Sequence, residues 1–328
     1  MKILFIGDIH IRALTPRNRK DDYLKTLCAK LRECWKIANS HNVAAVLQPG
    51  DIFHSPEVSI QTLLTAVEVF KECPVPFYTV PGNHDLFGWN LKSFDRTSLK
   101  LLELLCQNTD REKRNEFNVV LESFNYASGC CYLDFLNQVC FKPYTSDIDS
   151  SGTGYSGDFD DVSRTATLVA HGMLLDHDLP YEARYTNLFK LETNADIILS
   201  GHDHVGFGAI KRQDGKLFVN PGALMRLTAS EAEMQRVVQV AVVDTDARTA
   251  ELVPLTTALP ADEVLDRSKL EEKEERRYAM EEFAALIKTN QGTAMRNLDE
   301  IVEELGKQDS VEESIIAKAV DLLREARS

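Results

Sequence analysis

The stretch VAAVLQPGDIFH, residues 43–54, decides the fold because it joins a buried strand to an acidic turn. Residues 43–49 are apolar enough to form an interior strand of a sheet that is covered on both faces. Gly50 allows a sharp turn at the end of that strand, where α/β folds place their ligands. The carboxylate of Asp51 is then placed to bridge two divalent cations. A single Gly-Asp pair after a strand is weak evidence, so this prediction depends on the rest of the chain.

Four other segments also place metal-binding residue types directly after apolar runs. Six of the eight histidines fall in these segments or in 43–54, and only His41 and His177 lie outside them. Strand ends meet at one edge of a sheet, so we expect these side chains to converge. Carboxylate and imidazole donors without cysteine favour a borderline or hard cation over a thiolate site. The candidate residues are Asp8, His10, Asp51, His54, Asn83, His84, Asp85, His171, His202 and His204.

The ordered series DxH, GDxxH, GNHD, H and GHxH, from Asp8 to His204, resembles the calcineurin-like binuclear metallophosphoesterases. The resemblance implies two divalent metal ions, with manganese favoured and iron, zinc or magnesium as alternatives. It implies that one ion is held by Asp8, His10, Asp51 and His204. It implies that the second ion is held by Asp51, Asn83, His171 and His202.

The same resemblance implies a hydrolytic mechanism. Two cations can activate a bridging hydroxide and neutralise the charge that grows on a phosphoryl group attacked in line. His84 is not a ligand in the family but faces the substrate and stabilises or protonates the leaving oxygen. Asp85 is expected to orient the His84 imidazole, whereas Asp203 is expected to be structural. The turn at residues 220–222 resembles the family's late PG turn, and it either supports the site or contacts the substrate.

His54 points to one group within the metallophosphoesterases. A histidine three residues after the bridging aspartate resembles the SbcD-type nucleases, in which it is associated with substrate at the active site. These are the nuclease subunits of the double-strand-break repair complex, and they pair with an SMC-like ATPase. The Ser/Thr protein phosphatases have a different continuation after the same Gly-Asp pair. The resemblance therefore implies a DNA exonuclease or endonuclease that acts in repair, recombination or replication.

A basic loop follows the first predicted ligands. Arg12, Arg17 and Arg19 lie there with Lys20, and such a cluster in an acidic protein indicates contact with DNA phosphates. A solvated loop explains the cluster equally well. The net charge of −14 argues against indiscriminate binding of nucleic acid. Two alternatives to a nuclease remain: a small-molecule phosphodiesterase acting on cyclic nucleotides or lipid head groups, and a metal-bound scaffold that recruits an ATPase.

The order of helical and strand patterns predicts an α/β fold, a two-sheet β-sandwich flanked by helices. Strand and helix patterns alternate over residues 2–6, 22–40, 43–49, 59–71 and 76–80. This alternation implies right-handed crossovers and a largely parallel first sheet. The second sheet is expected to include residues 209–212, 216–220, 237–243 and 250–254. Residues 144–161, rich in Ser, Gly and Asp, are expected to form a mobile loop near the site.

The composition shifts near Pro260, so we expect a catalytic domain over 1–258 and an acidic helical region over 259–328. The latter has 18 acidic and 11 basic side chains, and it is predicted to contain a charged helix over 262–289. Ser310 and Glu313 resemble a capping box that opens a last helix. SbcD-type nucleases use such helices to grip the ATPase, but this tail is short for that. A homodimer contact or packing on its own core is an equal alternative.

Composition also bears on the cellular compartment. Seven cysteines without a regular framework predict reduced thiols and a cytoplasmic protein. No apolar stretch is long enough to span a bilayer, so no membrane partner is expected. The first predicted strand leads directly into the ligand Asp8, which leaves no room for a signal peptide.

Overall fold

The computed structural model describes residues 1–106, 117–119, 131–133, 139–150, 154–159, 164–268, 276–278, 280, 299, 302, 306 and 313–325. The chain divides into two compact units, Met1–Arg267 and Ser268–Ser328. The first unit includes the predicted catalytic domain and also the short helix α5, Ala261–Val264. This helix ends at Val264 and is followed by Leu265, which is extended, so the helix predicted over 262–289 is interrupted there. Most of that predicted helix lies outside the described residues.

The first sheet has the strand order β14-β13-β1-β2-β3-β4. Strands β1 to β4 pair in parallel, as the alternating pattern predicts, and β13 pairs antiparallel to β1. The bounds of these strands are Lys2–Phe5 for β1, Val46–Gln48 for β2, Phe77–Thr79 for β3, Phe117–Val119 for β4, Gln239–Asp244 for β13 and Thr249–Pro254 for β14.

The second sheet has the strand order β11-β12-β10-β7-β6-β5. Strands β6, β7, β10 and β12 are parallel neighbours. Strands β11 and β12 pair antiparallel and form a hairpin through Asp214-Gly215. The bounds are Cys131–Leu133 for β5, Val139–Lys142 for β6, Thr167–His171 for β7, Ile197–Gly201 for β10, Gly208–Lys211 for β11 and Leu217–Asn220 for β12.

The prediction that residues 237–243 and 250–254 belong to the second sheet is wrong. Strand β13 instead fills an interior place beside β1, with Leu4 opposite Val242. Its side chains alternate between two cores: Val242 packs with the helices, whereas Val243 packs between the two sheets. An apolar strand buried on both faces fits either sheet of a sandwich, so its sequence does not say which.

The two sheets face each other across one core. Ile3 and Phe5 of β1 meet residues of the second sheet such as Phe141 and Val219, and all of these side chains are fully buried. The opposite faces of both sheets carry further cores, so the strands are apolar on both sides. The predicted fold class, a two-sheet α/β sandwich with flanking helices, is confirmed.

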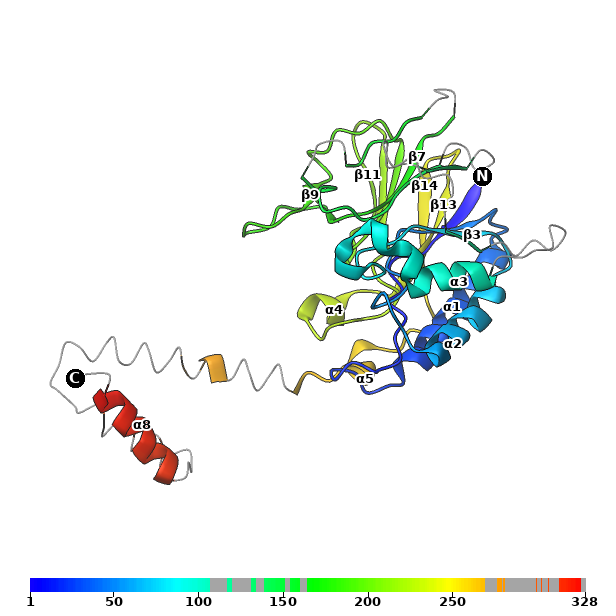
Figure 1. The fold of residues 1–328 in the computed structure, drawn as a ribbon. Coiled ribbons are helices and arrows are strands. Elements are labelled where there is room, and N and C mark those ends of the chain that lie inside the picture. The colour runs from blue at the N-terminus through cyan, green and yellow to red at the C-terminus, as the bar shows by residue number, and fades with distance from the viewer. Residues whose placement is uncertain are drawn as a thin grey trace. The chain divides into compact units, whose positions relative to one another are not determined.

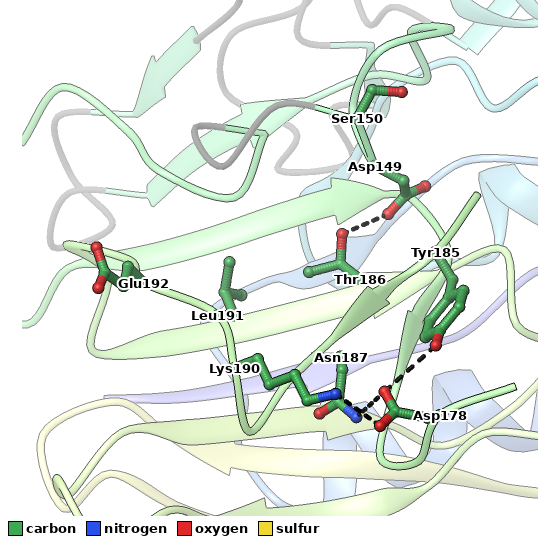
Figure 2. Close-up of a pocket in the computed structure, with 9 residues that line it drawn as sticks. All are labelled: Asp149, Ser150, Asp178, Tyr185, Thr186, Asn187, Lys190, Leu191 and Glu192. Atoms are coloured by element: carbon green, nitrogen blue, oxygen red, sulfur yellow. Dashed lines mark hydrogen bonds and ion pairs between the residues drawn. The ribbon is translucent and has the colours of Figure 1, made fainter. Parts of the chain in front are cut away.

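The outer face of the second sheet is covered by loop segments and by a small sheet of β8, Leu174–Leu175, and β9, Thr186–Asn187. Ile148 and Tyr155 are buried there, so the described parts of 144–161 pack as a cover rather than a mobile loop. A polar pocket of about 480 Å³ opens beside β9 (Figure 2). Its Asp178 already accepts hydrogen bonds from Tyr185, Asn187 and Lys190.

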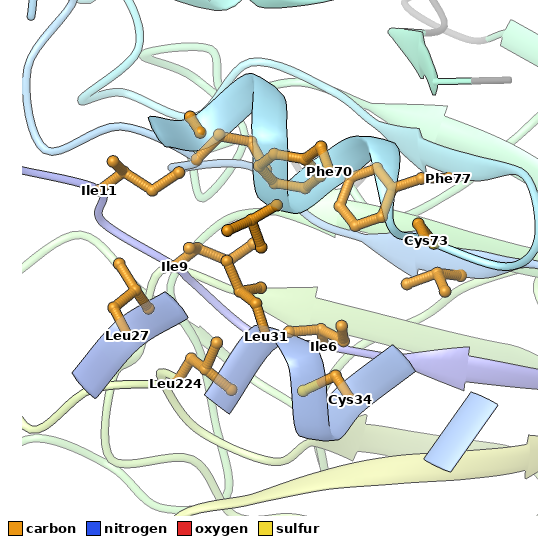
Figure 3. Close-up of a cluster of buried hydrophobic side chains, with 14 of the residues drawn as sticks. Ile6, Ile9, Ile11, Leu27, Leu31, Cys34, Phe70, Cys73, Phe77 and Leu224 are labelled. Atoms are coloured by element: carbon orange, nitrogen blue, oxygen red, sulfur yellow. The ribbon is translucent and has the colours of Figure 1, made fainter. Parts of the chain in front are cut away.

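Helices cover the outer face of the first sheet (Figures 1 and 3). Helix α1, Tyr23–Ser40, is capped by the Asp22 side chain, and α2, Ile60–Lys71, is capped by that of Ser59. Both helices occupy the predicted ranges, and Leu31 and Phe70 carry their apolar faces into the core with Ile6 of the sheet. A shorter helix, α3, spans Ser98–Cys106.

The second unit contains helix α8, Glu313–Glu325, on which Ile316 and Val320 are buried. Ser310, the predicted cap of this helix, lies outside the described residues. None of the helices that the structure describes combines the length and apolar character needed to cross a membrane. Within the described ranges, the free cysteines Cys28, Cys34, Cys73, Cys106 and Cys140 are all buried.

Candidate metal centre

The seven predicted metal ligands come together at the carboxyl ends of five strands. Asp8 and His10 follow β1, Asp51 follows β2, and Asn83 follows β3. The second sheet contributes His171, the last residue of β7, and the two histidines after β10, His202 and His204. Two groups whose ligand atoms lie within 4.8 Å of one another contain Asp51: Asp8, His10, Asp51 and His204, and Asp51, His171 and His202. A third such group is His10, His54 and His84.

The first group is built from imidazoles and carboxylates that face one another. The Nε2 atoms of His10 and His204 are 3.0 Å apart, and His204 Nε2 lies 3.4 Å from Asp8 Oδ2. Burial lowers the pKa of His10 to about 3, which keeps the imidazole neutral. A neutral imidazole has a free lone pair, the form that binds a cation.

The second group lies around His171. Its Nε2 is 3.4 Å from Asp51 Oδ2 and 3.0 Å from Asn83 Oδ1. The His202 ring is 5.0 Å from the His171 ring, centroid to centroid, and burial lowers the pKa of His202 to about 4. Asn83 thus joins this group by a direct contact with His171, as the resemblance implies for the second ion.

Asp51 belongs to both groups. Its Oδ1 accepts a hydrogen bond from the backbone N–H of His84 at 2.8 Å, whereas its Oδ2 has no hydrogen-bond partner among the described residues. Burial alone would raise the pKa of Asp51, but the combined effect of the surrounding imidazoles, His171 first, holds the pKa below its usual range. A buried carboxylate oxygen without a donor, aimed at imidazoles on both sides, fits two cations. The cluster is able to bind a dimetal site.

The backbone is strained where it presents the ligands. His10, Asp51 and His202 have φ values of 55°, 56° and 75°, in the left-handed region that non-glycine residues seldom occupy. Close approach also demands glycine at two positions. A Cβ on Gly82 would lie 2.1 Å from Asp51 Oδ1, and one on Gly201 would lie 2.4 Å from Asp8 Oδ1.

Gln48 supports the Asp51 turn, a role that the sequence reasoning missed. Its fully buried side chain accepts from Gly50 N at 2.8 Å and donates to the carbonyl oxygens of Gly7 and Gly50. Its Oε1 also accepts from the Thr79 hydroxyl. One polar residue inside the apolar run 43–49 was the signal for this role, because a buried amide must find partners.

The turn at residues 220–222 and the residues after it hold the backbone of the segments that contain Asp8 and Asp203. Asn220 donates to the Asp203 carbonyl at 3.0 Å and accepts from Gly222 N at 2.9 Å. Two residues further on, Leu224 N donates to the Asp8 carbonyl at 2.8 Å. Residues 220–222 are buried, so of the two predicted roles the structure favours support over substrate contact. Asp203 is structural, as expected, because it accepts from the backbone N–H groups of residues 205 and 206.

Asp85 does not orient the His84 imidazole. Its carboxylate accepts from three backbone N–H groups, those of Ile52, Phe53 and Gly82, at 2.8 to 3.2 Å. Asp85 therefore clamps the loop after β2 to the loop after β3. Burial, together with the charge of Asp51, raises its pKa to about 7. The hydrogen bond that fixes the His84 ring comes from the His54 carbonyl, 2.9 Å from His84 Nδ1.

The arginines of the basic loop differ in their contacts: Arg19 is bonded within the fold, whereas, among the residues that the structure describes, Arg12 and Arg17 are not. Arg19 is buried, forms two 2.8 Å hydrogen bonds to Asp21 and donates to the Arg226 carbonyl. These contacts contradict the predicted DNA contact for Arg19. Within the described part of the chain, Arg12 and Arg17 form no hydrogen bond or ion pair, and Arg17 is exposed.

Comparison with known protein families gives the class. Residues 1–206 match the family model described as calcineurin-like phosphoesterase, which covers more than half of the chain and all of the predicted ligands. The chain therefore belongs to the calcineurin-like phosphoesterase family. Together with the His/Asp cluster, this membership makes it a metal-dependent phosphoesterase, a hydrolase. A search of curated proteins found no significant match.

Several solved structures resemble the fold. An archaeal phosphodiesterase is 16% identical, with a TM-score of 0.38, over 78% of this chain and 100% of its own. The protein TT1561 of Thermus thermophilus is 14% identical, with a TM-score of 0.44, over 77% of this chain and 98% of its own. A dimetal phosphatase from Danio rerio is 11% identical, with a TM-score of 0.42, over 78% and 99%. The family assignment rests on residues 1–206, not on these similarities.

The clamp role of Asp85 predicts the effect of removing its carboxylate. Asp85→Ala leaves three buried N–H groups unpaired, so we expect the free energy of unfolding to fall by about 2 kcal/mol or more. Metal affinity should also fall because the Asp51 turn loosens. Urea unfolding and metal titration check both effects, with Asp85→Asn, which keeps one acceptor oxygen, as an intermediate control. Wild-type stability of the Ala variant would contradict the clamp.

The position of His84 predicts a separation of metal binding from turnover. Its hydrogen bond to Asp51 comes from the backbone N–H, which alanine keeps, so His84→Ala should retain both metal ions. Hydrolysis of a chromogenic phosphodiester should fall by about 10²- to 10⁴-fold, the usual effect of removing a general acid. Elemental analysis and steady-state kinetics measure the two effects. Loss of metal from this variant would show that His84 is a ligand.

Proposed function

We propose that this chain is a metal-dependent DNA phosphodiesterase of the SbcD type. The packing of His54 on His84 carries the proposal. The two rings stack with centroids 5.1 Å apart, and both lie beside the ligand His10, at 5.4 and 4.9 Å. The histidine that marks the resemblance to SbcD-type nucleases therefore contacts the proposed general acid directly.

The hydrogen bond between His84 and the His54 carbonyl indicates which ring nitrogen of His84 can act on the substrate. A carbonyl oxygen only accepts, so His84 Nδ1 carries a hydrogen and donates it to the His54 carbonyl. Nε2 is then the nitrogen left for the leaving oxygen, and it gives a proton when the ring is in the doubly protonated imidazolium form. The bound cations, for which we propose manganese, supply Lewis acidity and an activated water at this centre.

The free cations of the basic loop support DNA as the substrate. Burial and then the charge of Arg12 lower the pKa of His54 to about 4, which indicates that this guanidinium lies near the site. Arg17 is exposed on the same loop. Guanidinium groups beside a phosphodiester site are suited to phosphates of a polynucleotide backbone. In this proposal the nuclease acts in DNA repair, recombination or replication.

The second unit supports a proposed partner. On α8, Ile316 and Val320 are buried, whereas Ile315 is 57% exposed. An exposed apolar side chain on an amphipathic helix is suited to docking another helix. We propose an SMC-like ATPase as that partner, with a homodimer contact as the other use of this helix. Five buried free thiols in the described ranges support a reducing compartment such as the cytoplasm.

A small-molecule phosphodiesterase is the competing function. The engagement of Arg19 in the fold removes one cation from the proposed DNA contact, and the net charge of −14 repels polyanions. The two functions share the metal centre and differ only in the substrate that reaches it.

One experiment separates them. The full chain, loaded with manganese, is incubated with end-labelled linear duplex DNA, single-stranded DNA, cyclic nucleotides and a chromogenic diester. The proposal expects shortened DNA with cyclic nucleotides untouched. Hydrolysis of the small diesters alone, with the DNA intact, would replace the nuclease by a small-molecule phosphodiesterase.

If Arg12 and Arg17 contact DNA phosphates, their removal should weaken the reaction on DNA and spare the reaction on a small diester. Changing Arg12 and Arg17 to Gln should raise KM for DNA and reduce the salt slope of binding by about one unit for each phosphate that is no longer bound. Turnover of the chromogenic diester should stay near the wild-type value. Lys36→Gln removes an exposed cation from α1 and serves as the matched control. An equal reduction on DNA and on the small diester would contradict the phosphate contact.

A further inference from the structure

A pair of aromatic residues lies beside the metal centre on the side of the second donor group. The Tyr144 ring is 5.7 Å from the His202 ring and 6.1 Å from the His171 ring. The Trp89 ring is 6.4 Å from that of Tyr144, in a T-shaped arrangement with an interplanar angle of 73°. The Tyr144 ring therefore lies between Trp89 and the two candidate ligands His171 and His202. His54 and His84 lie on the other side, next to His10.

Trp89 is held out toward solvent. Its side chain is 63% exposed, which is unusual for the largest apolar side chain. It follows Gly88, and both residues have left-handed φ values, 58° for Trp89 and 56° for Gly88. This conformation is costly for a bulky residue, and such outliers cluster at ligand sites. The cost is a reason to look for a function in this turn.

Tyr144 is fixed to the metal-binding loop. Its backbone N–H donates to the Pro81 carbonyl at 3.0 Å, just before the ligand Asn83. Burial and then the negative charge of Asp149 raise the pKa of its hydroxyl, so the ring remains neutral. The tyrosine therefore presents an uncharged aromatic surface between the metal ligands and Trp89.

We propose that Trp89 and Tyr144 form a stacking subsite for a nucleobase whose nucleotide has its phosphate at the metal centre. The inference rests on the proposed DNA phosphodiesterase function and specifies how the substrate is held. A T-shaped pair uses the face of only one ring, so the other ring keeps both faces for further contacts. Every nucleobase has a π-face, so stacking here holds DNA without selecting its sequence.

The chemistry of the pair favours a base over an apolar protein partner. The neighbouring Phe87 is also partly exposed, but its ring is already covered by the Arg96 guanidinium at 5.4 Å. The strongly exposed ring of Trp89, with Tyr144 beside it, thus lies next to candidate donors for a phosphate-binding metal. A nucleotide has a planar aromatic base that can stack on these rings and a phosphate that can bind at the metal centre.

The chain offers a direct probe of stacking. It contains two tryptophans, and Trp35 is buried, with its indole N–H bonded to the Val69 carbonyl. Trp89 is thus the tryptophan that an added nucleotide can reach. The test titrates deoxyadenosine 5′-monophosphate and deoxyribose 5-phosphate, which lacks the base, into the full chain at constant divalent metal. Tryptophan fluorescence and calorimetry are recorded for the wild type, Trp89→Phe, Trp89→Ala and the exposed apolar control Leu104→Ala.

The proposal expects the nucleotide, but not the sugar phosphate, to quench wild-type fluorescence. Trp89→Phe should abolish the quenching and retain affinity, because phenylalanine still stacks. Trp89→Ala should raise the Kd for the nucleotide and the KM for DNA by about fivefold or more, the lower end of base–aromatic stacking. Its Kd for the sugar phosphate should be unchanged. Leu104→Ala should match the wild type throughout.

Failure of this inference is distinguishable from failure of the proposed function. Base-dependent quenching with uncut DNA would keep the stacking subsite and assign it to a small nucleotide substrate. Cleaved DNA with unchanged nucleotide affinity in Trp89→Ala would keep the nuclease and overturn the subsite. Equal quenching by the nucleotide and the sugar phosphate would also overturn it, because the fluorescence change would then not require a base.

Discussion

The candidate metal centre is organised around one oxygen atom, Oδ2 of Asp51. It is buried, has no hydrogen-bond partner among the described residues, and lies 3.4 Å from His171 Nε2 and 3.6 Å from His10 Nε2. Burying a carboxylate without compensation costs several kcal/mol. Two bound cations would offset that cost. The remaining donors, from both sheets, surround this oxygen in the way that two shared ions require.

Holding so many donors near one oxygen demands a rigid backbone. Three of the ligands, His10, Asp51 and His202, have left-handed φ values, which persist only where the surroundings enforce them. Asp85 and Gln48 enforce the Asp51 turn with hydrogen bonds to backbone groups, and the turn at residues 220–222 does the same behind Asp203. These contacts hold the candidate ligands in the arrangement that the structure shows.

The convergence of the candidate ligands could be predicted from the sequence because each lies at or just after the end of an apolar strand, and strand order alone brings such residues to one edge. It failed where a contact depends on distant parts of the chain. Asp85 was assigned to its neighbour His84 but bonds to loops on either side, and Arg19 was assigned to DNA but bonds to Asp21 and Arg226. Strand β13 was placed in the wrong sheet because its two buried faces fit either one. Exposure of Trp89 beside the site has no local sequence signal at all.

The most direct measurement of this account is anomalous diffraction from crystals of the full chain soaked in manganese. The account predicts two peaks that share Asp51. One should lie among Asp8, His10, Asp51 and His204, and the other among Asp51, Asn83, His171 and His202. A single peak, or two peaks of which only one contacts Asp51, would contradict the shared oxygen on which the account depends.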